Sequence, residues 1–172
     1  MNLIDKFDEY FNKIRESLDS PLDIKWLQVK NGYIGQFNID DWNYKIEYLK
    51  QIGNNWSFSF SYFDKDKNIW SYQISHKGTT GLNVLSTIKS GLYHMYNFTK
   101  PNSIIFSALD SSDTRKRLYQ SFCEEFCQKN NWKFSNRGNN DLKLFVMFDN
   151  SVSDEHKEEI MKSVKKVVEI GK

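Results

Sequence analysis

Residues 42–62, WNYKIEYLKQIGNNWSFSFSY, dominate the fold prediction because large apolar side chains recur at every second position. From Trp42 to Tyr48 they alternate with Asn, Lys and Glu, and after Gly53-Asn54-Asn55 they alternate with serines up to Tyr62. A period of two places successive side chains on opposite faces of a strand. This stretch therefore predicts two antiparallel strands joined by a turn, with one strongly aromatic face.

The same period extends on both sides of this hairpin. Upstream, residues 22–29 and 33–39 are predicted strands, joined at Asn31-Gly32, a dipeptide that accepts the positive φ angles of a tight turn. Downstream, the charged turn 64–68 leads into a strand over residues 69–75. Residues 22–75 therefore predict a meander of about five antiparallel strands. An amphipathic helix over residues 3–18 precedes it and ends before Pro21.

The second half of the chain has a different pattern. It predicts a helix over residues 82–95, a buried strand over 103–109, a helix that carries Leu118, Tyr119, Phe122 and Phe126, strands over 132–135 and 142–148, and a last helix from Ser153. The whole order predicts an α+β domain with a mixed, mainly antiparallel central sheet flanked by helices, including N-terminal and C-terminal helices. With 172 residues and no visible linker, we expect one domain over residues 1–172.

Composition excludes several classes of protein. Apolar residues make up 39% and charged residues 27%, and no apolar run approaches the roughly 20 residues of a membrane-spanning helix. A net charge of +2 does not indicate nucleic acid as the default partner. The first residues lack the basic start and apolar stretch of a secretory signal. These features predict a cytoplasmic globular protein that does not bind membranes.

Cysteine and histidine do not form a metal-binding pattern. Cys123 and Cys127 are four residues apart, whereas His76, His94 and His156 are scattered. We therefore predict no metal site and expect the two cysteines to be small buried apolar residues.

An anion site is predicted at the junction between the meander and the next helix. Residues 77–81, KGTTG, lead into the helix expected at Leu82. Free backbone N–H groups at a helix start suit a pyrophosphate, and glycines allow close approach of the backbone. Here the chain resembles the GNAT acyltransferases, in which a Gly-rich turn leads into a helix N-terminus. Their usual pattern is Gln/Arg-x-x-Gly-x-Gly/Ala, whereas here two residues separate Gly78 from Gly81 and no Gln or Arg stands at the required place.

The stretches 84–88, 104–108 and 115–119 also resemble a group of GNAT-like proteins that is common in bacteriophage genomes. The resemblance covers about 60 residues. It implies a GNAT-like fold and transfer of an acyl group from acetyl-CoA or another acyl-CoA to an amine. Under it, Gly78, Thr79, Thr80, Gly81 and Leu82 would bind the cofactor pyrophosphate. Tyr119 would protonate the departing thiolate, and His76 or Glu47 would be the candidate general base.

Two other functions are compatible with the same residues. Arg115, Lys116 and Arg117, followed by Lys129 and Lys133, could bind the phosphates of a nucleic acid while nearby aromatic residues stack on its bases. Alternatively, a non-catalytic phage accessory protein with a GNAT-like fold would use its aromatic meander to bind a host or viral protein, or for self-association.

Overall fold

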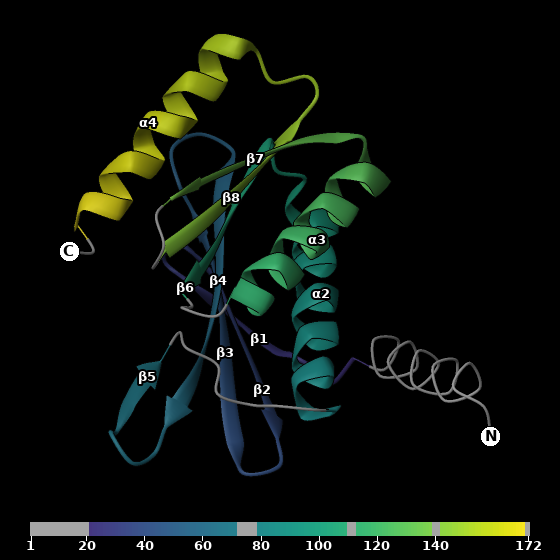
Figure 1. The fold of residues 1–172 in the computed structure, drawn as a ribbon, viewed down its shortest axis with the longest axis vertical. Coiled ribbons are helices and arrows are strands. Elements are labelled where there is room, and N and C mark those ends of the chain that lie inside the picture. Colours follow the sequence, from purple (N-terminus) through teal and green to yellow (C-terminus); the bar gives the residue numbers. More distant parts are fainter. Residues whose placement is uncertain (1–20, 72–78, 110–112, 139–141, 171–172) are drawn as a thin grey trace.

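The computed structural model describes residues 21–71, 79–109, 113–138 and 142–170 (Figure 1). In chain order, its elements are β1 (Lys25–Val29), β2 (Gly32–Ile39), β3 (Trp42–Lys50), β4 (Asn55–Asp64), β5 (Ile69–Ser71), α2 (Thr79–Thr99), β6 (Ser103–Leu109), α3 (Asp113–Asn130), β7 (Trp132–Gly138), β8 (Leu142–Asp149) and α4 (Asp154–Ile170). The predicted helix over residues 3–18 and residues 72–75 of the predicted fifth strand lie outside the described residues.

The strands form one mixed sheet in the order β1-β2-β3-β4-β6-β8-β7, and β5 pairs with the end of β4. Neighbouring strands are antiparallel except for β4 and β6, which are parallel. The predicted hairpin is confirmed, with Tyr44 opposite Tyr62 and Tyr48 opposite Phe58. The expected place of β6 in the sheet interior is also confirmed, because it lies between β4 and β8 with Ile104 and Phe106 fully buried.

The main core lies between the sheet and helices α2 and α3. Alternate residues of β3 and β4 point into it, as the period of two requires. The largest fully buried members are Tyr44, Tyr48, Phe58, Phe106, Phe126 and Phe145. Aromatic rings thus fill the space between sheet and helices, as the alternation in residues 42–62 predicted.

The opposite face of the sheet has an apolar part and a polar part. Leu144 and Val146 of β8 are buried there in a cluster with Ile160 of α4. Strands β3 and β4 pair with each other elsewhere in the sheet. On this face, their side chains that alternate with the core residues are mainly Lys, Glu and Ser. This part of the face carries few apolar groups to bury.

The predicted GNAT-like fold, with a central sheet flanked by helices, is wrong. The described residues form eight strands and three helices, and all three helices come after the first five strands in the chain. The reason lies in the tight turns that join those five strands, because they leave no chain between them to form covering helices. An α+β chain with a mixed, mainly antiparallel sheet remains.

The first hairpin turn lies one residue earlier than predicted. Val29 pairs with Gly32, so Lys30 and Asn31 form the loop. Gly32 has a φ of 152°, and a Cβ at this position would lie 2.1 Å from the backbone oxygen of Tyr48. Glycine is therefore required by the close approach of β3 and not by the turn itself.

Candidate functional site

The parallel strands β4 and β6 diverge after a short paired segment. Their pairing starts at Asn55 and Ser103 and ends at Phe58 and Phe106, although β4 continues to Asp64 and β6 to Leu109. On its other edge β4 stays paired with β3 up to Tyr62, where β5 joins on the β6 side. Between these points, Ser59 to Ser61 have no strand partner on that edge among the described residues. We call this divergence the β4–β6 fork.

Helix α2 begins at the same end of the molecule as β5 and the C-terminal end of β4 (Figure 1). It starts at Thr79, three residues before the predicted start at Leu82. The first four N–H groups of a helix have no intrahelical acceptor, so the N–H groups of residues 79–82 carry the partial positive charge of this end. No acidic residue lies in the first turn. An anion is therefore favoured at this helix start.

Tyr119 lies in the core beside the fork. Its side chain is 5% exposed, and its ring centroid is 5.7 Å from that of Phe60 and 5.9 Å from that of Phe106. Phe106 is the last residue of β6 that pairs with β4. Phe60 lies two residues beyond Phe58, which is the last residue of β4 that pairs with β6. The ring of Tyr119 therefore packs on the two strands where they separate.

Two further tyrosines lie close to Tyr119, and the sequence pattern did not single them out. Tyr44 and Tyr62 are cross-strand partners with ring centroids 6.5 Å apart. Burial raises the pKa of Tyr44 above its usual value, and electrostatic interactions with Tyr62, Asp40 and Tyr119 raise it further. The Tyr44 phenol is therefore held in its protonated form. Counting the strand register across the turn at Gly53 could have revealed the pairing of Tyr44 with Tyr62.

A buried hydroxyl without a hydrogen-bond partner also lies at the fork. Ser61 is fully buried, and its Oγ atom has no hydrogen-bond partner among the described residues. Buried polar side-chain atoms are bonded in the great majority of cases, so this hydroxyl is available to a ligand or a water molecule. Ser61 alternates with Phe60 and Tyr62 and so faces the opposite side of the sheet from Tyr119.

The second candidate base, Glu47, does not lie with Tyr119. It is on β3 opposite Ser59, on the polar face, and its carboxylate is 3.5 Å from Lys45 Nζ. Lys45 Nζ in turn lies 4.7 Å from the ring centroid of Trp70. Glu47 is therefore one strand away from the fork and is held in an ion pair. The other site residues predicted from the sequence, His76 and Gly78, lie outside the described residues.

The two cysteines are buried and unpaired, as predicted. Cys123 is fully buried, and Cys127 is 4% exposed and donates to the backbone oxygen of Lys133 at 3.6 Å. Burial raises the pKa of the Cys127 thiol to about 12 and that of Cys123 well above its usual value. Among the described residues, no group of His, Cys, Asp and Glu could hold a metal ion.

We expect the thiol reagent DTNB to leave both cysteines unmodified in the native protein at pH 8, and to modify both after denaturation. The raised thiol pKa values also predict that stability is unaffected below the unfolded pKa near 9 and falls as pH rises from 9 towards 12. Thiol release followed at 412 nm and denaturant unfolding at several pH values test these expectations. Rapid modification of the native protein would show that the cysteines are accessible.

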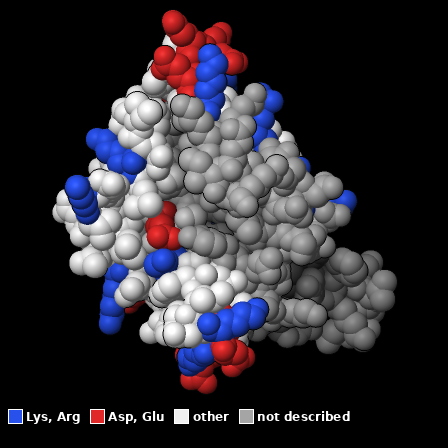
Figure 2. Space-filling model, turned by 90° about the vertical axis from the view of Figure 1, so that its left-hand side faces the viewer, with Lys and Arg blue, Asp and Glu red and all other residues white. Residues whose placement is uncertain are grey.

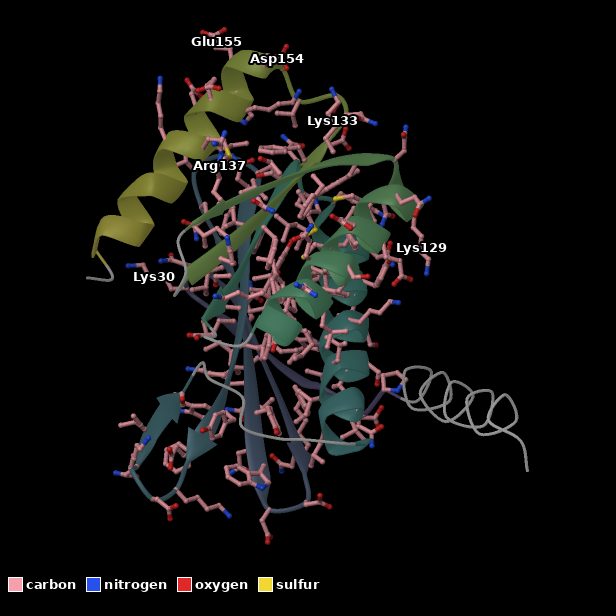
Figure 3. All side chains as sticks on the ribbon, in the orientation of Figure 1. Lys30, Lys129, Lys133, Arg137, Asp154 and Glu155 are labelled. Atoms are coloured by element: carbon pink, nitrogen blue, oxygen red, sulfur yellow. The ribbon has the colours of Figure 1, made fainter. Side chains whose placement is uncertain are left out.

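Two members of the predicted basic surface, Lys129 and Lys133, lie beside acidic residues. Lys129 Nζ lies 2.6 Å from Glu125, which also contacts Lys89 at 2.8 Å. In Figure 3, Lys133 lies just below Asp154, and Lys129 lies on the other side of the molecule from Lys30. At the top and bottom of the face drawn in Figure 2, positive and negative side chains lie beside one another. These lysines do not form a continuous basic surface.

Comparison with protein-family models, with curated proteins and with solved structures finds no significant match. Within the described residues, every helix is too short or too polar to span a bilayer. The function of the chain must therefore be inferred from the arrangement of its own residues.

Proposed function

We propose that the protein transfers an acyl group from an acyl-CoA, such as acetyl-CoA, to an amine. The β4–β6 fork is the observation that carries this proposal, because pairing of the two strands stops at Phe58 and Phe106, and Ser59 to Ser61 have no partner on that edge among the described strands. An extended ligand with amide groups can satisfy such an edge, and the pantetheine arm of CoA has two amides. The helix start at residues 79–82 supports the proposal because it suits the pyrophosphate of the same molecule.

The reaction assigns one task to Tyr119. The acceptor nitrogen attacks the thioester carbonyl, a C–N bond forms and the C–S bond breaks, and the departing thiolate takes the proton of the Tyr119 hydroxyl. A base removes the proton that the acceptor nitrogen loses. Glu47 lies on the opposite face of the sheet from Tyr119, so His76 is the candidate that we retain. We place the reaction in the cytoplasm, since two reduced cysteines fit a reducing compartment.

Calorimetry and thermal unfolding with CoA and acetyl-CoA test this proposal directly. A ligand at 100 times its dissociation constant stabilises a protein by about 2.7 kcal/mol. For a chain of this length, that raises Tm by about 5–10 °C. Release of heat and a raised Tm are expected with both ligands. Absence of heat with CoA and acetyl-CoA at millimolar concentration would exclude acyl transfer. The alternative is then a non-catalytic protein that binds a macromolecular partner. That partner could contact the exposed Leu27 on edge strand β1.

Gly81→Asp is expected to block CoA binding and leave the fold intact. Gly81 lies in the first turn of α2, where an added carboxylate favours the helix but repels a pyrophosphate. Two unit charges 4 Å apart interact by about 1–4 kcal/mol, so affinity should fall about 5- to 700-fold. Asn97→Asp adds the same charge at the other end of α2 and is the matched control. Equal affinity of the two variants for CoA would show that the pyrophosphate does not bind at this helix start.

A further inference from the structure

A pocket of about 540 Å³ lies between the β1–β2 turn, the β3–β4 turn and the last turn of α2. Its lining includes Lys30, Asn31, Tyr33, Lys50, Gln51 and Phe98. Helix α2 has 21 residues, which at about 1.5 Å per residue separates its two ends by about 30 Å. The pocket at the C-terminal end of α2 is therefore distinct from the helix start and the proposed acyl-CoA site.

A continuous row of aromatic rings runs from the core to this pocket. Tyr48 and Trp56 are stacked with centroids 4.5 Å apart, and Trp56 is followed by Tyr33 at 6.2 Å. The row ends at Phe98, whose ring lies edge-on to Tyr33 at 5.5 Å and is 63% exposed. Trp56 is covered by its neighbours, so Phe98 and the half-buried Tyr33 are the rings that a ligand can contact. An exposed ring on a supported aromatic row provides a stacking surface.

The charged groups of the pocket are all positive. Lys30 and Lys50 are exposed and line the pocket, and no Asp or Glu lines it within the described part of the chain. Figure 3 labels Lys30, which lies far from the paired Lys129. The backbone near these lysines is held in place because the Lys50 backbone N–H donates to the Asn31 carbonyl oxygen at 2.7 Å. Two exposed lysines at one pocket favour an anionic ligand.

The surrounding amides make this pocket rigid. Gln51 Nε2 donates to Ser57 Oγ at 3.0 Å, and Asn54 Nδ2 donates to the Lys100 oxygen at 2.8 Å. Asn54 also accepts from Trp56 Nε1 at 3.1 Å. These bonds tie the β3–β4 turn to the end of α2. The pocket is thus largely formed before a ligand enters, which lowers the cost of binding.

We propose that this pocket binds a nucleobase with an attached phosphate, either as a free nucleotide or within a single strand of nucleic acid. The base stacks on the exposed ring of Phe98 and meets the perpendicular ring of Tyr33 edge-on, and the phosphate lies between Lys30 and Lys50. An aromatic stacking surface next to positive charge is the combination that single-stranded nucleic acids require. A purely apolar ligand would gain nothing from the lysines, and a cationic one would be repelled by them.

Two binding measurements test this proposal. The probes are a fluorescein-labelled single-stranded 10-mer, followed by anisotropy at low salt, and ATP, followed by calorimetry. Phe98→Ala should weaken binding about 5- to 150-fold, the effect of losing one base-aromatic stack. Lys30→Glu should weaken it and lower the slope of log K against log salt by about 0.7 for the 10-mer. Binding of the 10-mer alone indicates a strand, and binding of ATP as well indicates a nucleotide unit.

Matched controls separate the pocket from general charge and hydrophobicity. Lys65→Glu changes an exposed lysine in the β4–β5 turn, and Ile52→Ala changes an apolar side chain that is 82% exposed and does not line the pocket. Both should bind like the unchanged protein. No binding of either probe at millimolar concentration would overturn the proposal. Equal losses in Lys65→Glu and Lys30→Glu, or in Ile52→Ala and Phe98→Ala, would overturn it as well.

Discussion

Tyr119→Phe is expected to lower acyl-transfer turnover by about 10²- to 10⁴-fold, the usual contribution of a positioned general acid. The ring keeps its contacts with Phe60 and Phe106, so packing is preserved. Loss of one hydroxyl costs about 1 kcal/mol of stability or less. Turnover with acetyl-CoA and an amine acceptor, measured together with Tm, tests both expectations on one variant.

Tyr96→Phe is the matched control for this experiment. Tyr96 is a half-buried tyrosine on α2 whose ring packs against Phe126 and Trp132, with centroids 5.2 and 5.4 Å away. Its substitution also removes one hydroxyl from an aromatic contact and should leave turnover unchanged. An unchanged rate in Tyr119→Phe with a lowered Tm would show that Tyr119 is a packing residue and not the acid.

Phe106→Ala should lower the free energy of unfolding by about 3–5 kcal/mol, the usual cost of truncating a buried phenylalanine. Phe106 is fully buried, and its ring contacts those of Phe58, Phe122 and Phe145 at centroid distances of 5.6 to 6.3 Å. For a chain of this length, the loss corresponds to a fall in Tm of about 6–20 °C. Urea unfolding followed by tryptophan fluorescence measures the change.

Leu118→Ala provides the comparison. Leu118 lies on α3 and is 43% exposed, so truncation removes little buried surface and leaves a good helix former. Its effect should stay within about 0.5 kcal/mol, the range of ordinary surface substitutions. A Phe106→Ala variant as stable as Leu118→Ala would contradict the central position assigned to β6.

The strands were the most predictable part of the fold. The alternation from Trp42 to Tyr62 indicated both the elements and the face they bury, because a strand exposes and buries side chains with a period of two. Helical spacing was less informative about exposure. Leu118 was expected to be buried beside Phe122 and Phe126. Residues at the edge of the apolar face of a helix can be buried or exposed, and packing against the sheet leaves Leu118 exposed.

Only part of the predicted site lies among the described residues. The start of α2 could be found from the sequence because it is a local feature, whereas Tyr119 was singled out by the resemblance to the GNAT acyltransferases. The fork depends on a parallel pairing between β4 and β6, which are separated by α2 in the chain, so no local pattern indicates where their pairing ends. Likewise, Lys30, Lys50 and Phe98 come from three distant segments, and only their packing creates the pocket.

By itself, the sequence determined the strands, most helix positions, the buried cysteines and the aromatic character of the core, because each follows from the spacing of apolar side chains. The tertiary structure decided the strand order and the divergence of β4 from β6. It also excluded the predicted GNAT-like arrangement of flanking helices. It also decided which lysines are paired and which line a pocket. These properties depend on contacts between residues far apart in the chain, and the period of a single segment carries no information about such contacts.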